Sequence, residues 1–222
     1  MAQRTGEEAA HDSPKDALRH HGSGIRARSN TEPQMTSQPT SSQTIGPFFH
    51  DALLDEDRSE LVSPDHPEAI KIEGTIYDGA GEVVPDAMVE IWQANRAGRY
   101  DHPADDREDL PLDEDFSGFG RSGTDASGEF SFLTVKPGPV PGPDGRVQAP
   151  HVMVSVFARG LLDRLVTRIY FPDEEEANAV DPVLSSIEDQ ELRRTLVARE
   201  EGGALRFDIH LQGDKQTAFF GF

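Results

Sequence analysis

The chain has 222 residues, in which 41 acidic side chains outnumber 21 basic ones and give a net charge of −20. This length is enough for one large β domain with a real core. The negative charge disfavours nucleic acid and anionic membranes as partners, and the lack of cysteine excludes disulfides and thiolate chemistry. Without a bilayer-spanning apolar run or a secretory apolar region, we expect a cytoplasmic protein.

The first 34 residues are rich in Gly, Ser, His, Arg and Glu and have no apolar pattern, so we expect a disordered extension. They contain five acidic and five basic side chains, and the acidic excess therefore lies downstream. Met35 follows directly and is an alternative start of translation. We expect one domain over residues 35–222, which begins with an arm over residues 35–69.

Short runs of alternating apolar and polar residues dominate the chain from residue 70 onward, a pattern typical of half-buried strands. The predicted strands cover residues 70–77, 87–93, 129–135, 149–160, 164–171 and 205–211. Gly- and Pro-containing turns separate them, with residues 78–81 as the first. Runs of this kind indicate an all-β fold, a β-sandwich, rather than alternating βαβ units.

Two further segments interrupt the strands. A long loop rich in Asp, Pro and Gly is expected over residues 96–123, and long loops in compact domains are usually functional or disordered. One helix is expected in the C-terminal half, from Pro182 to about Arg199, with Asp181 as its N-cap. Gly202 and Gly203 are expected to end this helix.

The strand over residues 149–160 places His151 and Met153 on one face, because side chains two residues apart in a strand point the same way. Two histidines at this spacing would offer two imidazoles to one metal ion, but Met153 supplies a thioether, a soft ligand poorly suited to ferric iron. A lone strand histidine is more often a hydrogen-bonded structural residue than a ligand. Asp208 and His210 form a second pair, which is either a polar strand face or, together with His151, a metal-binding facial triad.

Eight short motifs that occur in order along the chain resemble those of the intradiol ring-cleavage dioxygenase family. They lie at residues 42–48, 74–78, 89–94, 98–100, 116–121, 134–138, 149–151 and 167–171. The resemblance covers roughly residues 35–222 and implies an intradiol dioxygenase-like β-sandwich. It also implies a non-haem ferric ion, which catalytic members of the family hold with two tyrosines and two histidines.

Four positions of this chain match the iron ligands of the family. Tyr100, in Gly-Arg-Tyr, matches the first tyrosine, and His151 matches the first histidine, whereas Val140 and Met153 stand at the other two positions. Neither replacement can substitute for a phenolate or an imidazole on Fe(III), so we call these four residues the vestigial site and expect no metal on this chain. Gln148 lies near the place of an arginine that precedes the histidine pair in catalytic members. We expect Tyr100 and His151 to form hydrogen bonds within the vestigial site.

This ligand loss resembles the non-iron-binding α subunit of two-chain members of the family. The resemblance implies a hetero-oligomer with a β subunit that binds Fe(III), an active site between the two chains, and a small aromatic substrate that reacts with O₂. It places Thr44, Gly46 and Pro47 of the arm against the substrate cavity of the partner. It also matches Arg159 to an arginine near the mouth of the site.

Other interpretations remain open at this point. Arg159 is equally well explained by a surface ion pair with one of the many carboxylates, and Gly46-Pro47 by an ordinary turn. For the whole chain, the alternatives are a homomeric metal-dependent dioxygenase of another catechol and a β-sandwich binding module without a catalytic role.

Overall fold

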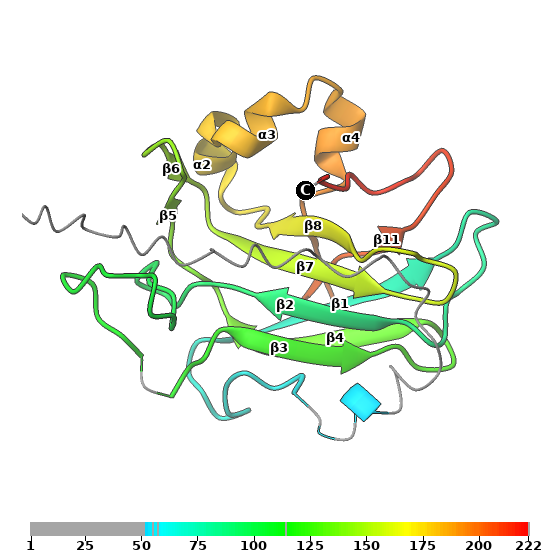
Figure 1. Ribbon diagram of the computed structural model, residues 1–222, viewed down its shortest axis with the longest axis horizontal. Coiled ribbons are helices and arrows are strands. Elements are labelled where there is room, and N and C mark those ends of the chain that lie inside the picture. The colour runs from blue at the N-terminus through cyan, green and yellow to red at the C-terminus, as the bar shows by residue number, and fades with distance from the viewer. Residues whose placement is uncertain (1–51, 55, 57, 114, 222) are drawn as a thin grey trace, which may run out of the picture. The chain divides into compact units, whose positions relative to one another are not determined.

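The structure is a computed structural model that describes residues 52–221, apart from residues 55, 57 and 114. The predicted extension over residues 1–34, the alternative start at Met35 and the arm residues Thr44, Gly46 and Pro47 lie outside the described residues. Figure 1 shows the strands as a layered stack with the helices gathered beside β8.

One sheet has four antiparallel strands in the order β3-β2-β7-β8. These strands are β2 (Met88–Trp92), β3 (Phe119–Gly123), β7 (His151–Phe157) and β8 (Leu165–Tyr170). In β7, Val152, Val154 and Val156 are fully buried while the residues between them are partly exposed. The predicted alternation of the His151 strand is therefore confirmed.

The second sheet is built on β1 (Ala69–Tyr77), which pairs antiparallel with β4 (Glu129–Val135). On its other edge, β1 pairs in parallel with two short strands from the end of the chain. The remaining strands are β5 (Val140–Pro141), β6 (Val147–Gln148), β9 (Arg199–Glu201), β10 (Ala204–Arg206) and β11 (Ile209–His210). β5 and β6 form a separate small hairpin, and β9 pairs with β10.

The main core lies between the two sheets. Ile72 and Phe132 from the second sheet are in the same buried cluster as Ile91, Val154 and Ile169 from the first. Burying one face of each sheet against the other is the arrangement of a β-sandwich, as predicted. A smaller cluster under the helices includes Leu184 and Leu196. Among the described residues, no helix has the length and apolar character needed to cross a membrane.

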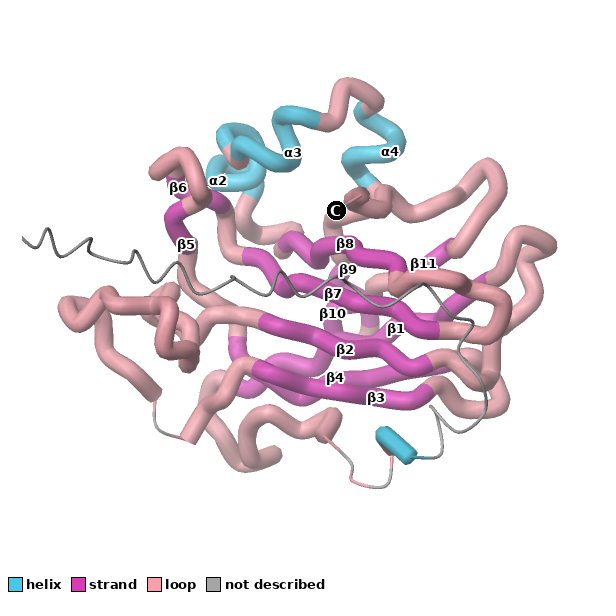
Figure 2. Tube along the Cα trace, in the orientation of Figure 1, coloured by secondary structure: helices cyan, strands magenta, loops and turns pink. Residues whose placement is uncertain are grey.

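The predicted helix over residues 182–199 is instead two short helices, α3 (Pro182–Ser186) and α4 (Gln190–Arg194), and an unpredicted helix, α2 (Glu175–Val180), precedes them. Figure 2 shows them following one another along one side of the molecule. The predicted N-cap is correct, because the Asp181 carboxylate accepts hydrogen bonds from the amides of Val183 and Leu184. The helix breaks because the apolar stripe has a step of five residues between Ile187 and Leu192, which does not fit the helical period.

The prediction that Gly202 and Gly203 end a helix is also wrong. Both residues have positive φ angles, 60° and 86°, and they form the two-residue turn between β9 and β10. A Gly-Gly pair in this role is typical of a tight hairpin, since both central residues of such a turn need positive φ.

The predicted strand over residues 205–211 is divided into β10 and β11. The Thr75 amide donates to the Asp208 carboxylate at 3.1 Å instead of to a backbone carbonyl, so the ladder with β1 is interrupted at that point. The register on either side is unchanged, because Glu73 lies opposite Arg206 and Ile76 opposite Ile209.

Candidate functional site: a vestigial iron centre

The vestigial site lies at the end of the four-stranded sheet where β7 begins and where β2 and β8 end. The pairing of these strands sets Trp92 opposite Met153, and His151 opposite Tyr170. Figure 1 places the β5–β6 hairpin, which carries Val140, at the same end. The structure thus gathers the sequence-predicted ligand positions at one end of the sandwich.

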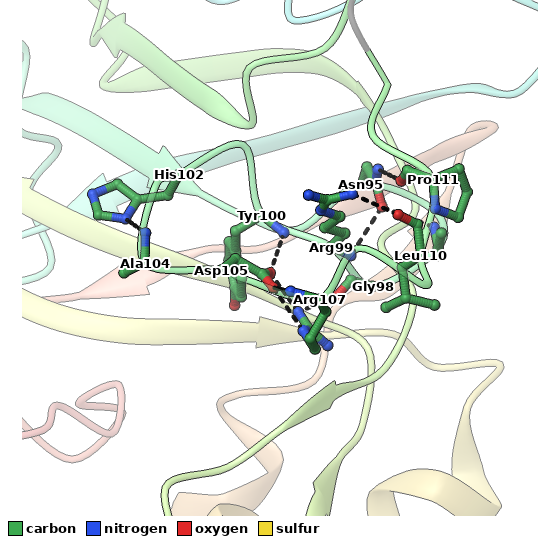
Figure 3. Close-up of polar contacts among 11 residues, drawn as sticks. Asn95, Gly98, Arg99, Tyr100, His102, Ala104, Asp105, Arg107, Leu110 and Pro111 are labelled. Atoms are coloured by element: carbon green, nitrogen blue, oxygen red, sulfur yellow. Dashed lines mark hydrogen bonds and ion pairs between the residues drawn. The ribbon is translucent and has the colours of Figure 1, made fainter.

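Tyr100 is positioned by the loop that follows β2. The Asn95 side-chain oxygen accepts hydrogen bonds from the amides of Ala97 and Arg99, both at 3.0 Å, and its amide nitrogen donates to the Pro111 carbonyl at 2.9 Å. The bond to Pro111 ties the start of the loop to a point 16 residues further along (Figure 3). The predicted long loop therefore has a defined conformation around Tyr100, and Phe119–Gly123 at its end forms the unpredicted strand β3.

Asp105 fixes the backbone at Tyr100 through a compact set of charged hydrogen bonds. Its carboxylate accepts from the Tyr100 amide at 2.8 Å and from Arg107 at 2.7 and 2.5 Å, as Figure 3 shows. The side-chain hydrogen bonds from Arg107 hold the pKa of Asp105 well below its usual range. Arg107 also donates to the Gly98 carbonyl at 2.7 Å, so the carboxylate and the guanidinium together clamp the turn.

The Tyr100 ring stacks on Trp92, with ring centroids 5.8 Å apart and planes 11° from parallel. Burial raises the pKa of the Tyr100 phenol, and the positive charges of Arg168 and Arg107 oppose that rise. The phenol is therefore neutral near pH 7, whereas a ferric ligand would be a phenolate.

His151 is buried at the start of β7, with 4 % of its surface exposed. Its Nδ1 lies 2.8 Å from the Ala149 carbonyl oxygen, and because that oxygen can only accept, Nδ1 carries the proton. Burial lowers the pKa of His151 to about 4, with a smaller contribution in the same direction from the charge of Arg168. The ring is thus a neutral, hydrogen-bonded histidine, as we expected from the sequence.

Arg168 on β8 was not singled out from the sequence, although it lies within the motif at residues 167–171. It stands opposite Met153, and its Nε donates to the Met153 Sδ at 3.1 Å. Its Nη1 donates to the Gln148 Oε1 at 2.7 Å and to the Tyr170 hydroxyl oxygen at 3.2 Å. A guanidinium from the neighbouring strand therefore lies beside Gln148.

Asp181 continues this network away from the vestigial site. Its buried carboxylate accepts from the Tyr170 hydroxyl at 3.1 Å and from the Ala149 amide at 2.8 Å, in addition to capping α3. A continuous set of hydrogen bonds consequently runs from Met153 through Arg168 and Tyr170 to the helices. Sequence analysis identified Asp181 as a cap but gave no indication of its contacts with residues 149 and 170.

Arg159 lies away from the vestigial site. It follows the end of β7, whereas His151 begins that strand, so the two are separated by roughly 20 Å of extended chain. Its guanidinium forms an ion pair with Asp86, and 71 % of the side chain is exposed. The structure thus contains the surface ion pair that was one of the two interpretations, and a role toward the substrate stays a prediction.

The alternative triad of Asp208, His210 and His151 is not formed. His151 belongs to the four-stranded sheet, while β10 and β11, which flank Asp208, pair with β1 in the other sheet. The Asp208 carboxylate accepts from Arg206 at 2.8 Å and from Arg199 at 2.9 Å, and the His210 ring stacks on Tyr77 at 4.8 Å. Both residues serve local structure.

The residues of the vestigial site do not fit a ferric ion. Val140 has no donor atom, Met153 offers a thioether that is already bonded to a cation, and only Tyr100 and His151 have suitable groups. No group of three or more His, Cys, Asp or Glu side chains that could hold a metal occurs in the part of the chain that the structure describes.

Comparisons with known proteins agree with this assignment of the fold. A family model described as dioxygenase matches residues 44–213. The chain is 42 % identical over 199 residues to the protocatechuate 3,4-dioxygenase alpha chain of Pseudomonas putida, covering 82 % of this chain and 96 % of that one. It is 38 % identical over 187 residues to the corresponding beta chain of Burkholderia cepacia, covering 79 % and 76 % of the two chains.

A solved structure supports the fold independently. Hydroxyquinol 1,2-dioxygenase from Pseudomonas putida DLL-E4 superposes with a TM-score of 0.51 at 18 % identity, over 82 % of this chain and 69 % of that chain. The family match and the similarity to alpha chains show that the chain belongs to the intradiol ring-cleavage dioxygenase family.

Proposed function

We propose that this chain is the non-iron-binding α subunit of a protocatechuate 3,4-dioxygenase. With an iron-bearing β subunit, it would catalyse cleavage of protocatechuate by O₂, in which both oxygen atoms enter between the two hydroxyl-bearing carbons to give 3-carboxy-cis,cis-muconate. The observation that carries this proposal is the 42 % identity to an alpha chain of that enzyme across 96 % of its length. This reaction would be a step in the catabolism of aromatic compounds through β-ketoadipate.

We assign the Fe(III) to the partner because the vestigial site of this chain cannot hold it. Val140 and Met153 remove one phenolate and one imidazole, and the Arg168 guanidinium contacts Met153 directly. The family uses non-haem iron(III), so an enzyme that includes this chain needs a second chain with a complete set of two tyrosines and two histidines. The similarity to both alpha and beta chains supports such a pairing.

The contribution of this chain would be the shape and charge of the substrate cavity in the partner. We propose that Thr44, Gly46 and Pro47 line that cavity, since a Gly-Pro step is a rigid corner with little side chain that can approach an aromatic ring closely. Arg159 would attract the substrate carboxylate. Its guanidinium is exposed to solvent, whereas 31 % of the Asp86 side chain is exposed, so turning to the substrate would take the cation from a partly buried carboxylate.

The test is to purify the full chain alone and after co-expression with a protocatechuate 3,4-dioxygenase β chain. We expect the lone chain to bind no iron, to lack phenolate-to-iron charge-transfer colour and to consume no O₂ with protocatechuate. We expect colour, O₂ uptake and 3-carboxy-cis,cis-muconate from the co-purified complex. Colour and turnover from the lone chain, or a stable complex without turnover, would contradict the proposal.

A further inference from the structure

Within the described residues, every hydrogen-bond acceptor of the Arg168 guanidinium is neutral. The acceptors are the Met153 thioether, the Gln148 amide oxygen and the Tyr170 hydroxyl, at 3.1, 2.7 and 3.2 Å. Most arginines in the described part of the chain form an ion pair with a carboxylate, but no such pair within 4.0 Å is formed by Arg168 there. Its link to a carboxylate runs through the Tyr170 hydroxyl to Asp181.

The same guanidinium lies among the positions that match iron ligands. It contacts Met153 directly, and its charge acts on the phenol of Tyr100 and on the ring of His151. Gln148, to which it donates, lies across the β5–β6 hairpin from Val140. One cation therefore contacts one of the four positions, is bonded to the cross-strand neighbour of a second, and acts electrostatically on the other two.

We infer that the Arg168 guanidinium takes the place of a metal ion as the permanent cation of the vestigial site and excludes ferric iron independently of the missing ligands. A guanidinium cannot be deprotonated in a protein, so its charge persists at every pH at which the chain is folded. Bringing Fe(III) into the same space would set two cations against each other in a partly buried site, where the repulsion is weakly screened. This goes beyond the proposed function, which requires only that ligands are lost.

The inference predicts that restoring ligands alone does not restore iron binding. In the full chain, we would compare the double variant Val140→Tyr, Met153→His with the triple variant that adds Arg168→Gln. Glutamine keeps a donor amide for Gln148 but removes the charge. A matched control adds Arg164→Gln, an exposed arginine on the turn before β8, to the double variant.

The readouts are bound iron, measured as the excess over the wild-type chain, and the visible phenolate-to-iron absorption. We expect no excess iron and no colour from the double variant or its Arg164→Gln control, and about one ferric ion per chain with colour from the triple variant. Equal iron in the double and triple variants would overturn the inference. A folded triple variant without iron would overturn it as well.

A second measurement decides the case if the ligand variants do not fold. Arg168→Ala leaves acceptors without their cation, and we expect its thermal midpoint to be lower than that of the wild type. Millimolar methylguanidinium should restore part of the loss, while methylurea, its neutral isostere, should not. No rescue, or equal rescue by both compounds, would overturn the role of Arg168 as the cation of the site. None of these readouts depends on the β chain or on turnover, so they fail separately from the proposed function.

Discussion

Asp105 is the residue on which the position of Tyr100 depends most directly. It accepts hydrogen bonds from the Tyr100 amide and two from the Arg107 side chain, and 7 % of its own side chain is exposed. A carboxylate with this many charged and backbone donors is much more stable ionised than protonated. The Asp105–Arg107 pair therefore couples the conformation of the loop to the protonation state of one group.

We expect Asp105→Asn to destabilise the folded chain by about 2 kcal/mol at pH 7, because Arg107 keeps its partly buried charge and loses the anionic oxygen that balances it. The pKa of Asp105 is lowered on folding, so the carboxylate contributes fully above about pH 4 and loses its contribution as the pH falls through the folded pKa. Thermal unfolding of the wild type and the variant should be compared between about pH 3 and pH 7. The difference in stability between them should be constant over most of this range and should become smaller at the acid end.

The matched control for this experiment is Asp106→Asn, which changes an exposed neighbour in the same loop. It should leave the free energy of unfolding within about 0.5 kcal/mol of the wild-type value. This account of the loop would be contradicted if Asp105→Asn had the same melting temperature as the wild type at pH 7. It would also be contradicted if the difference in stability between the two proteins grew in acid.

At the scale of single residues, the sequence identified positions but not partners. The alternation of β7 placed His151 and Met153 on one face, and the motif at residues 98–100 singled out Tyr100. Arg168 was missed because its contact with Met153 depends on the register between β8 and β7. That register cannot be derived from the residues of one strand alone.

At the scale of elements, Asp181 joins parts of the chain that are distant in sequence. Its carboxylate accepts four hydrogen bonds, from the amides of Ala149, Val183 and Leu184 and from the Tyr170 hydroxyl. The cap of α3 is thus also the connection between the helices and the four-stranded sheet. By contrast, Asp189 caps α4 from an exposed position and bonds only to amides of its own helix.

We expect Asp181→Ala to lower the free energy of unfolding by about 3 kcal/mol or more, because four donors, three of them buried, lose their acceptor. Asp181→Asn keeps one acceptor oxygen and should cost about half as much. The control Asp189→Ala removes an exposed cap and should cost about 1 kcal/mol. Denaturant unfolding would measure all three, and equal losses for Asp181→Ala and Asp189→Ala would show that the connection to the sheet adds nothing.

The elements differ in how well the sequence predicted them, and the reasons are local. The strand over residues 129–135 was predicted with its observed bounds because its alternation is regular. β3 was missed because it contains two glycines and two polar residues. At Gly120 a Cβ would meet the side chains of Leu61 and Ile91 at 2.6 and 3.0 Å, so the glycine allows close packing there. A close approach between distant segments of this kind cannot be derived from strand propensity.

At the scale of the whole molecule, the four-stranded sheet has two chemically different ends. The vestigial site and its cation occupy the end where β7 begins, and Arg159 lies beyond the other end of β7. The net charge of −20 repels anionic ligands in general, so a local arginine has a disproportionate effect on where an anion binds. If the chain contributes to a substrate site in a partner, the Arg159 end is the place to look.

In the αβ complex, we expect Arg159→Gln to raise the KM for protocatechuate about tenfold with little change in kcat, since a charged hydrogen bond to the substrate carboxylate would be lost. Catechol, which has no carboxylate, should show no change. Steady-state O₂ uptake would measure both, with Arg164→Gln as the control. A KM that rises equally for both substrates, or for neither, would remove Arg159 from the substrate site.

The four hydrogen bonds at Asp181 also have a consequence for how the molecule opens. The amides of Ala149, Val183 and Leu184 share one carboxylate, and they lie on both sides of the boundary between sheet and helices. Detaching the helices exposes all three amides in a single event, so hydrogen exchange should give them one common free energy of opening. The amides of Glu191 and Leu192, capped by exposed Asp189, should exchange sooner. The helical segment would thus unfold as one cooperative unit that the carboxylate of a single aspartate holds to the sheet.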